Sequence, residues 1–344
     1  MDVASSYLHT PLGPKEKLYL SPPKGFEIVT RYMGLEYEEG DLRRLHSCIY
    51  GLKQAGREWF LRWIAELKVL GFVAIQSEPC LMIKTVNKVL TETIAFHVDD
   101  AIHSTEKVPT YENFLEKIQE KFPIKNLGRP QKFLGLYLKT IPGGIRLHLK
   151  PYIKELLERF NLTNLPIAHA PAPAIRLSKG GKPITGDPKK YYRVMLGAAL
   201  WIAVTLRGPD IGFSVIQCAR FCEEPSEAHW KALLQIFAYL KGTAHYGLDY
   251  VRTQDVEKLQ IKTYVDASWA SADDRFSEGG ALVFGMGGVL DFKFGRIKCI
   301  CRSSHESELM QASKTATFLK AVWAGIRPSS EREVISTISH RHAL

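Results

Sequence analysis

The sequence has no run of about 20 uncharged apolar residues, the length that a membrane-spanning helix requires. Its first residues also lack the basic start and the apolar core of a signal peptide. No internal repeat is visible along the 344 residues. We therefore expect an intracellular protein, in the cytoplasm or the nucleus, that has no membrane partner.

Cysteine is scarce, and its spacing excludes a disulfide framework. Six cysteines in 344 residues are too few for a scaffold held by disulfides. Cys218 and Cys222 lie on a predicted helix, and Cys299 and Cys301 alternate on a predicted strand. Neither pair has zinc-finger spacing with matching histidines. We expect all six thiols to be reduced and none to hold a metal.

Charge and size are those of a basic globular protein of two or three domains. Apolar residues make up 45% and charged residues 24% of the chain. The net charge is +10, with a sequence pI near 9.2. A positive excess suits a polyanionic partner such as nucleic acid, although many basic proteins bind none. Composition alone therefore leaves the partner open.

Hydrophobic periodicity predicts an α+β arrangement in the first 160 residues. We expect helices at 57–70, 111–121 and 151–160, and strands at 81–84, 91–98, 133–140 and 145–150. Gly143 and Gly144 between the last two strands predict a hairpin. Pro151 suits the first turn of the helix that follows, because its fixed φ is tolerated there.

The chain changes character at residue 163, where a linker is expected. Residues 163–190 hold five prolines and the pair Gly180-Gly181 without periodicity. Beyond it we expect helices at 192–206, 210–222 and 227–241, strands at 259–265, 280–284, 289–294 and 297–301, a helix at 304–324, and a polar tail. The order is α+β, then helical, then a β-meander followed by a helix.

Two adjacent carboxylates, Asp99 and Asp100, end the apolar run that begins at Ile94. Two such charges about 4 Å apart repel by about 4 kcal/mol at an effective dielectric of about 20, which favours a cation, a proton or a basic neighbour. Magnesium is the usual cation for sites built only from oxygen ligands. The alternative is a strand that ends in a solvated turn, which Asp also favours. The two residues alone leave both interpretations open.

Several segments together resemble one family, the polymerase polyproteins of copia-type LTR retrotransposons. The strongest match is Ile49-Tyr50-Gly51-Leu52-Lys53-Gln54-Ala55-Gly56-Arg57-Glu58-Trp59. The chain begins with a segment similar to the family's Asp-Val-x-x-Ala-Phe-Leu motif, and Phe96–Asp100 stands where the family usually has Tyr-Val-Asp-Asp. In order, the matching segments are 2–8, 18–26, 49–59, 78–81, 96–100, 127–135, 192–197, 207–211, 239–243, 264–270 and 303–308.

The resemblance implies an α+β fold with a palm-like reverse transcriptase domain, a helical connection and a partial ribonuclease H-like α/β domain. It places the reverse transcriptase at 1–165, a linker at 166–190, the connection at 191–255, the ribonuclease H-like part at 256–325 and a polar tail at 326–344. It also implies a two-metal Mg²⁺ site. The implied partners are an RNA template, a DNA primer, an RNA–DNA hybrid and deoxynucleoside triphosphates.

The resemblance assigns roles to eight residues. Asp2, Asp99 and Asp100 match the catalytic, metal-holding carboxylates of the polymerase. Gln54 and Lys53 fall in the motif near the incoming nucleotide, and Tyr7 stands where the family has an aromatic residue close to the sugar. Asp266 and Glu308 match catalytic, metal-holding carboxylates of ribonuclease H, with Glu306 close by. Without these roles, Lys53 and Gln54 are an exposed helix entry, Tyr7 is a core aromatic residue, and Asp266 and Glu308 are solvent-facing charges.

Some positions depart from the family pattern. His97 replaces the usual Tyr, Gly56 replaces a Pro, Gly208 interrupts an Arg-Pro-Asp motif, and His103 lies in an expected apolar strand. Asp2 is the second residue, so its strand has little upstream sequence to pair, and the amino group of Met1 puts a positive charge beside it. We expect the family's preceding finger segment to be missing.

The ribonuclease H match is also partial. We expect the third carboxylate and the strand that carries it to be absent after residue 325. We therefore expect a retrotransposon-derived reverse transcriptase, truncated at both ends, whose two sites are impaired. The alternative is a non-catalytic remnant that binds nucleic acid through its basic excess.

Overall fold

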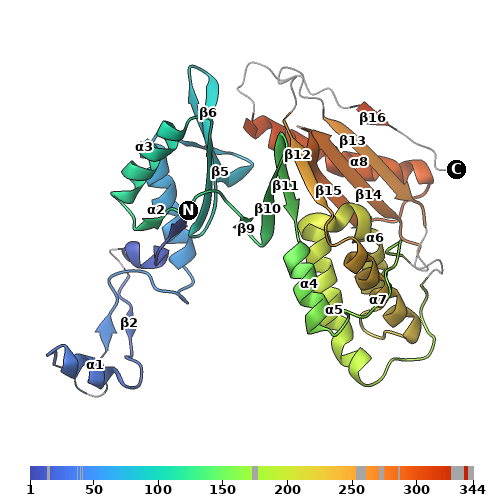
Figure 1. Cartoon of the computed structure of the whole chain (residues 1–344), viewed down its shortest axis with the longest axis horizontal. Helices are drawn as coiled ribbons and strands as arrows, with labels where there is room; N and C mark the ends of the chain where they lie inside the picture. The colour runs from blue at the N-terminus through green and yellow to red at the C-terminus, as the bar shows by residue number, and fades with distance from the viewer. Residues whose placement is uncertain are drawn as a thin grey trace. The chain divides into compact units, whose positions relative to one another are not determined.

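The computed structural model describes residues 1–13, 16–36, 38, 40, 42–172, 177–252, 261–270, 275–285, 287–326 and 337–339, with backbone alone at 314, 317–326 and 337–339. The chain forms two compact units, Met1–Pro130 and Gln131–Leu344, which Figure 1 shows in colours that follow the sequence. Each unit is described by itself.

A six-stranded sheet organises the first unit, in the order β4-β5-β6-β7-β1-β8. Its strands are β1 (Asp2–Val3), β4 (Val73–Ile75), β5 (Glu78–Val86), β6 (Val89–His97), β7 (Asp100–Thr105) and β8 (Ile124–Lys125). The pairs within it are antiparallel. The 3₁₀ turn η1 (Ser6–His9) follows β1 directly.

Two amphipathic helices pack their apolar side chains against this sheet. Helix α2 (Ala55–Val69) buries Trp59, Trp63 and Leu67, and α3 (Val108–Gln119) buries Phe114 and Ile118. These side chains form one cluster with apolar residues of β5, β6 and β7. A smaller part, with β2 (Tyr19–Leu20), β3 (Arg43–Arg44) and α1 (Phe26–Tyr32), is a two-stranded sheet with a short helix.

The second unit opens with an antiparallel sheet in the order β12-β11-β10-β9. Its strands are β9 (Lys132–Phe133), β10 (Leu136–Ile141), β11 (Gly144–His148) and β12 (Gly247–Val251). Helices α4 (Lys150–Arg159), α5 (Asp187–Ile202), α6 (Gly208–Ala219) and α7 (Glu227–Gly242) build the larger hydrophobic core. A π-helical turn, η2 (Ala203–Arg207), joins α5 to α6 without a break.

A second sheet of this unit has the order β15-β14-β13-β16. Its strands are β13 (Lys262–Ser268), β14 (Glu278–Gly285), β15 (Gly288–Arg296) and β16 (Thr337–Ser339), and α8 (Ser304–Ile326) packs on β13 and β14. Strand β16 pairs with β13 in parallel. The expectation that no strand follows residue 325 is therefore wrong. The strand does not supply the third carboxylate, because residues 334–344 contain no Asp or Glu.

Most of the longer predicted elements are confirmed, with ends that differ by a few residues. The predicted strand at 297–301 is wrong, because β15 ends at Arg296 and the chain then leaves the sheet. The Ile297 amide donates to the Ser277 carbonyl at 2.9 Å, and the Cys301 carbonyl accepts from the Trp269 indole at 2.8 Å. Ile297 and Cys301 are therefore buried in a loop, whereas Ile300 between them is exposed. All six cysteines are free.

The helical run Asp187–Ala219 differs from the expectation that no segment is long and apolar enough to span a membrane. By length and composition it could cross a membrane, and half of its most apolar stretch is buried inside the protein. Core helices of ordinary globular domains have the same property, and α5 and α6 contribute to the core of the second unit.

Candidate functional site

The Asp99-Asp100 pair lies in the tight hairpin that joins β6 to β7. His97 and Asp100 are register partners across the turn, which Val98 and Asp99 form. Val98 has a φ of 56°, a left-handed conformation that is strained for a β-branched residue. The indole Nε1 of Trp59, buried on α2, donates to the Val98 carbonyl at 2.6 Å. The helix therefore anchors the turn from the core side.

Strand β1 brings the third carboxylate to this hairpin. Asp2 is the register partner of Asp100, and the Val3 amide donates to the Asp99 carbonyl at 3.0 Å. The other edge of β1 pairs with β8, where Asp2 faces Lys125. The strand is as short as expected, yet it is paired on both edges. Directly opposite residues of an antiparallel pair have Cβ atoms about 5 Å apart, so Asp2 and Asp100 are neighbours.

The amino group of Met1 lies at the same place. It donates to the Ala101 carbonyl at 2.8 Å, and burial lowers its pKa below the usual value of 8.0, against the opposing effects of Asp100 and Asp2.

The three carboxylates are the right kind of ligand for a hard divalent cation. Asp2 and Asp99 are half-buried and Asp100 is exposed, so water has access to them. Within the described ranges, however, no group of three or more His, Cys, Asp or Glu side chains is arranged to hold a metal ion. The backbone thus brings the three residues together, while their side chains are not gathered into a ligand group.

The residues assigned to nucleotide recognition lie around the start of α2. Tyr7 in η1 contacts the ring of Tyr50, with centroids 4.7 Å apart. Lys53 is exposed, and the Gln54 amide donates to the Glu16 carboxylate at 3.1 Å. A Cβ at Gly56, where the family has Pro, would lie 3.6 Å from the Tyr7 hydroxyl. These contacts place the quoted motif beside Tyr7.

Asp266 and Glu308, the carboxylates matched to ribonuclease H by resemblance, lie on opposite faces of the β13–β15 sheet. In the register of β13–β15, Asp266 is level with Gly280 and Phe294, which faces α6 at Gly212. Gln311 of α8 instead lies against Gly279, on the opposite face. Glu308 is half-buried on α8. The strand register therefore turns Asp266 towards α6 and away from the helix that carries Glu308.

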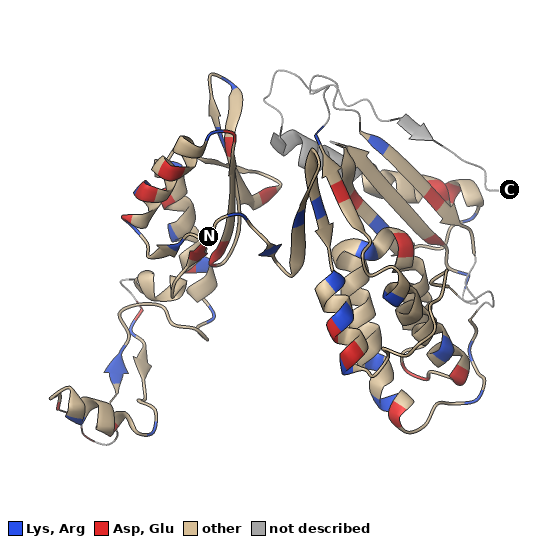
Figure 2. Cartoon of the chain, in the orientation of Figure 1, with Lys and Arg blue, Asp and Glu red and all other residues tan. Residues whose placement is uncertain are grey.

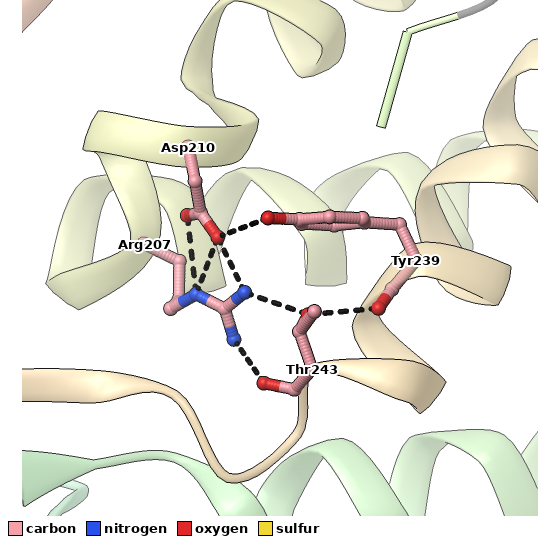
Figure 3. Close-up of polar contacts among 4 residues, drawn as sticks. All are labelled: Arg207, Asp210, Tyr239 and Thr243. Carbon is pink, nitrogen blue, oxygen red and sulfur yellow. Dashed lines mark hydrogen bonds and ion pairs between the residues drawn. The ribbon is translucent and has the colours of Figure 1, made fainter. Parts of the chain in front are cut away.

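A polar network near α6 was not predicted, although its four residues belong to two of the matching segments, 207–211 and 239–243. Figure 3 shows the buried guanidinium of Arg207 against the Asp210 carboxylate, with which it forms an ion pair. Arg207 also donates to the carbonyl and the hydroxyl of Thr243, at 2.9 Å each, and the Tyr239 hydroxyl donates to Asp210 at 3.2 Å. The network joins the start of α6 to the end of α7.

Charged side chains of both signs are interspersed on the elements of each unit. Figure 2 shows Lys and Arg beside Asp and Glu on α3 and α4, for example. The positive excess is therefore spread over elements that also carry acidic side chains.

Comparison with known proteins gives a consistent result. Residues 1–174 match the family model described as "Reverse transcriptase (RNA-dependent DNA polymerase)". The chain is 29% identical over 324 residues to the retrovirus-related Pol polyprotein from transposon TNT 1-94 of Nicotiana tabacum, covering 92% of this chain and 23% of that protein. It is 30% identical over 321 residues to the corresponding polyprotein from transposon RE1 of Arabidopsis thaliana, covering 92% and 21%.

A shorter relative and one solved structure complete the comparison. A putative transposon Ty5-1 protein of Saccharomyces cerevisiae is 28% identical over 323 residues, covering 92% of this chain and 99% of that protein. The foamy viral protease-reverse transcriptase, solved in complex with an RNA/DNA hybrid, has a TM-score of 0.54 and 13% identity, covering 94% and 37%. At that identity the likeness concerns the fold, and it confirms the predicted α+β class. The chain spans less than a quarter of the two plant polyproteins.

Proposed function

Because the chain belongs to the reverse transcriptase family, we propose that its first unit carries an RNA-directed DNA polymerase site of retrotransposon origin. The observation that supports this most directly is the pairing of β1 with β7, which sets Asp2 opposite Asp100 beside the Asp99 turn. The proposed partners are an RNA template, a DNA primer and deoxynucleoside triphosphates, and the proposed place of action is inside the cell.

In this proposal each residue has a definite task. Asp2, Asp99 and Asp100 would hold Mg²⁺, which would supply activation of the primer hydroxyl and neutralise charge on the phosphates. Trp59 fixes the turn that presents Asp99, because its indole binds the Val98 carbonyl. Tyr7 in η1 and Gln54 at the N-cap of α2 would orient the nucleotide, and Lys53 would offer a positive charge beside them.

A primer-extension assay with Mg²⁺ tests the proposal. We expect the wild-type chain to extend a DNA primer on an RNA template, and Asp99→Asn to abolish that product. Glu112→Gln, which changes an exposed carboxylate on α3, serves as the matched control and should leave extension unchanged. Extension that survives Asp99→Asn, or no extension by the wild-type chain, contradicts the proposal.

A second candidate, a non-catalytic remnant that binds nucleic acid, is favoured by one specific observation. No three-ligand group is arranged for a metal within the described residues, while the whole chain carries a net charge of +10. Such binding depends on counterion release, so its affinity should fall steeply between 50 and 200 mM salt. Salt-sensitive binding without extension supports this candidate, and binding that is unchanged by salt contradicts it.

We further propose that the sheet β13–β16 with α8 is ribonuclease H-like in origin and does not cleave a hybrid. Two-metal hydrolysis needs several carboxylates on adjacent elements. Here the register turns Asp266 towards α6, while Glu308 belongs to α8. Labelled RNA in the same primer-extension assay reports cleavage, and cleavage that is lost in Asp266→Asn would contradict this part of the proposal.

A further inference from the structure

A cavity of about 410 Å³ lies in the second unit, between the start of α6 and one face of the β13–β15 sheet. Helix α6 contributes Asp210 and Phe213 to its lining, and the sheet contributes Tyr264, Asp266 and Phe294. The strand register explains why the sheet side of the cavity is open. Gly280 lies between Asp266 and Phe294, and a Cβ there would meet only the Lys293 carbonyl, at 3.8 Å. Space beside the Asp266 carboxylate is therefore left open.

Aromatic rings form the walls of this cavity. Phe292 and Phe294 lie nearly parallel, with an interplanar angle of 9° and centroids 6.2 Å apart. Phe213 is 59% exposed and Tyr264 is 43% exposed, so much of their ring surface is available to a ligand. Planar apolar groups gain from contact with such rings, and cations are attracted to the ring faces.

One carboxylate in the cavity lacks a compensating charge. Asp210 is already paired with Arg207 and accepts from Tyr239 (Figure 3). The Asp266 side chain has no hydrogen bond or ion pair with any residue that the structure describes. Lys293, the basic residue of the lining, belongs to the opposite face by strand alternation, and its Nζ lies 3.8 Å from the Asp291 carboxylate.

We propose that this cavity binds a flat organic cation of the amidinium or guanidinium class, with its plane against the aromatic walls and its charge at Asp266. A planar amidinium donates two parallel hydrogen bonds to a carboxylate, which an ammonium or a hydrated metal ion does not. A pocket that combines apolar walls with one polar anchor is typical of small-molecule sites. The proposal does not depend on polymerase activity.

Binding of benzamidine to the full chain, followed by the chemical shifts of the protein, tests the proposal. Benzamide, which has the same shape without the charge, is the matched ligand. We expect saturable binding of benzamidine and at least about tenfold weaker binding of benzamide, the difference that a charge-assisted hydrogen bond supplies. Asp266→Asn should weaken benzamidine binding by a similar factor, whereas Glu158→Gln, an exposed carboxylate on α4, should not change it.

Several outcomes would overturn the proposal. They are an absence of saturable benzamidine binding, equal binding of benzamide, and unchanged affinity in Asp266→Asn. Shifts of the same residues by MgCl₂ alone would show a metal site instead. The comparison of the two ligands uses the wild-type chain, so it stays decisive if a variant fails to fold. Phe213→Ala should weaken the binding of both benzamidine and benzamide, because it removes one aromatic ring from the cavity wall.

Discussion

At the scale of single residues, the strained Val98 turn depends on a distant hydrogen bond. A non-glycine residue with positive φ costs of the order of 1–3 kcal/mol and persists only where its surroundings determine it. Trp59 Nε1 donates to the Val98 carbonyl from 39 positions away in the sequence. The neighbouring Trp63, equally buried on α2, has an indole nitrogen without a hydrogen-bond partner among the described residues.

The two tryptophans therefore form a matched pair for mutation. Phe replaces the indole with a smaller ring at either position, but only Trp59→Phe removes a hydrogen bond. We expect Trp59→Phe to lower the free energy of unfolding by about 1 kcal/mol more than Trp63→Phe, the usual net value of one buried hydrogen bond. Urea denaturation of both variants measures the difference. Equal losses would mean that the Trp59 bond does not stabilise the turn.

Two buried histidines make the stability depend on pH. His229 accepts from the Ser226 amide at Nδ1 and binds the Ser178 carbonyl through Nε2, so the neutral ring caps α7. His103 lies 3.0 Å from the Glu92 carboxylate under Phe114. Burial lowers the pKa of both side chains below the usual 6.5, although Glu92 and the Ser178 carbonyl act in the opposite direction.

The sign of the pH effect follows from these lowered pKa values. On acidification the unfolded chain binds the proton first, so the His229 contribution is complete above about pH 6.5 and is lost as the pH falls towards the folded pKa. We expect unfolding free energy to fall by up to about 1.4 kcal/mol per pH unit for this histidine. The slope between pH 6.5 and 5 should be smaller in His229→Gln. The exposed His169→Gln is the control, and an unchanged slope in His229→Gln refutes the prediction.

Candidate site residues could be predicted from the sequence where they belong to local motifs. The contacts between these residues could not be predicted. The segment around Asp99 and the start at Asp2 were identified through their resemblance to the family's motifs, and the structure makes Asp2 and Asp100 register partners. The contact of Gln54 with Glu16 joins residues 38 positions apart, and the Asp210 network depends on Thr243 at the end of another helix. No periodic pattern encodes such pairs, because they arise only when separate elements pack.

At the scale of elements, the length of a helix or strand determined whether the sequence predicted it. The long helices and strands were predicted because their apolar spacing extends over several turns or pairs. Strands β1 and β8 have two residues each, too few for a pattern, although they hold the candidate site together. The loop after Arg296 resembled a strand because its buried residues alternate. Tertiary packing therefore determined the short elements.

Helix α6 packs so closely on β15 that one of its glycines has no room for a side chain. A Cβ at Gly208 would lie 2.2 Å from a ring carbon of Phe292, whereas a Cβ at Gly197 in α5 would meet nothing within 4 Å. We expect Gly208→Ala to lower the free energy of unfolding by roughly 1–3 kcal/mol through overpacking. Gly197→Ala should raise it by roughly 0.5–1 kcal/mol, because Ala suits a helix better.

Chemical denaturation of the two glycine variants should give changes in the free energy of unfolding of opposite sign. A neutral or stabilising Gly208→Ala would show that the Phe292 ring moves away at little cost.

At the scale of the whole molecule, the chain holds two separate hydrophobic cores. One lies under α2 and α3 and the other among α4–α7, each within its own compact unit. Units with independent cores generally unfold independently unless a large interface couples them.

Calorimetry should accordingly resolve two unfolding transitions in this chain. Trp59→Phe should shift only the transition of the first unit, and Gly208→Ala only that of the second. A single transition that both variants shift equally would contradict two independent units. Limited proteolysis with cleavage near residue 130 gives a separate check, since the units divide there.

The π-helical turn between α5 and α6 has a consequence for how this chain tolerates an extra residue. Buried positions recur along the helical run at Met195, Ala199, Ile202 and Leu206, and Arg207 and Gly208 at the turn are buried as well. A π-helical turn holds one residue more than an α-helical turn. Gly208, which interrupts the Arg-Pro-Asp motif of the resembled family, follows this turn directly. Arg207 and Asp210, on either side of Gly208, form an ion pair within the continuous helical run.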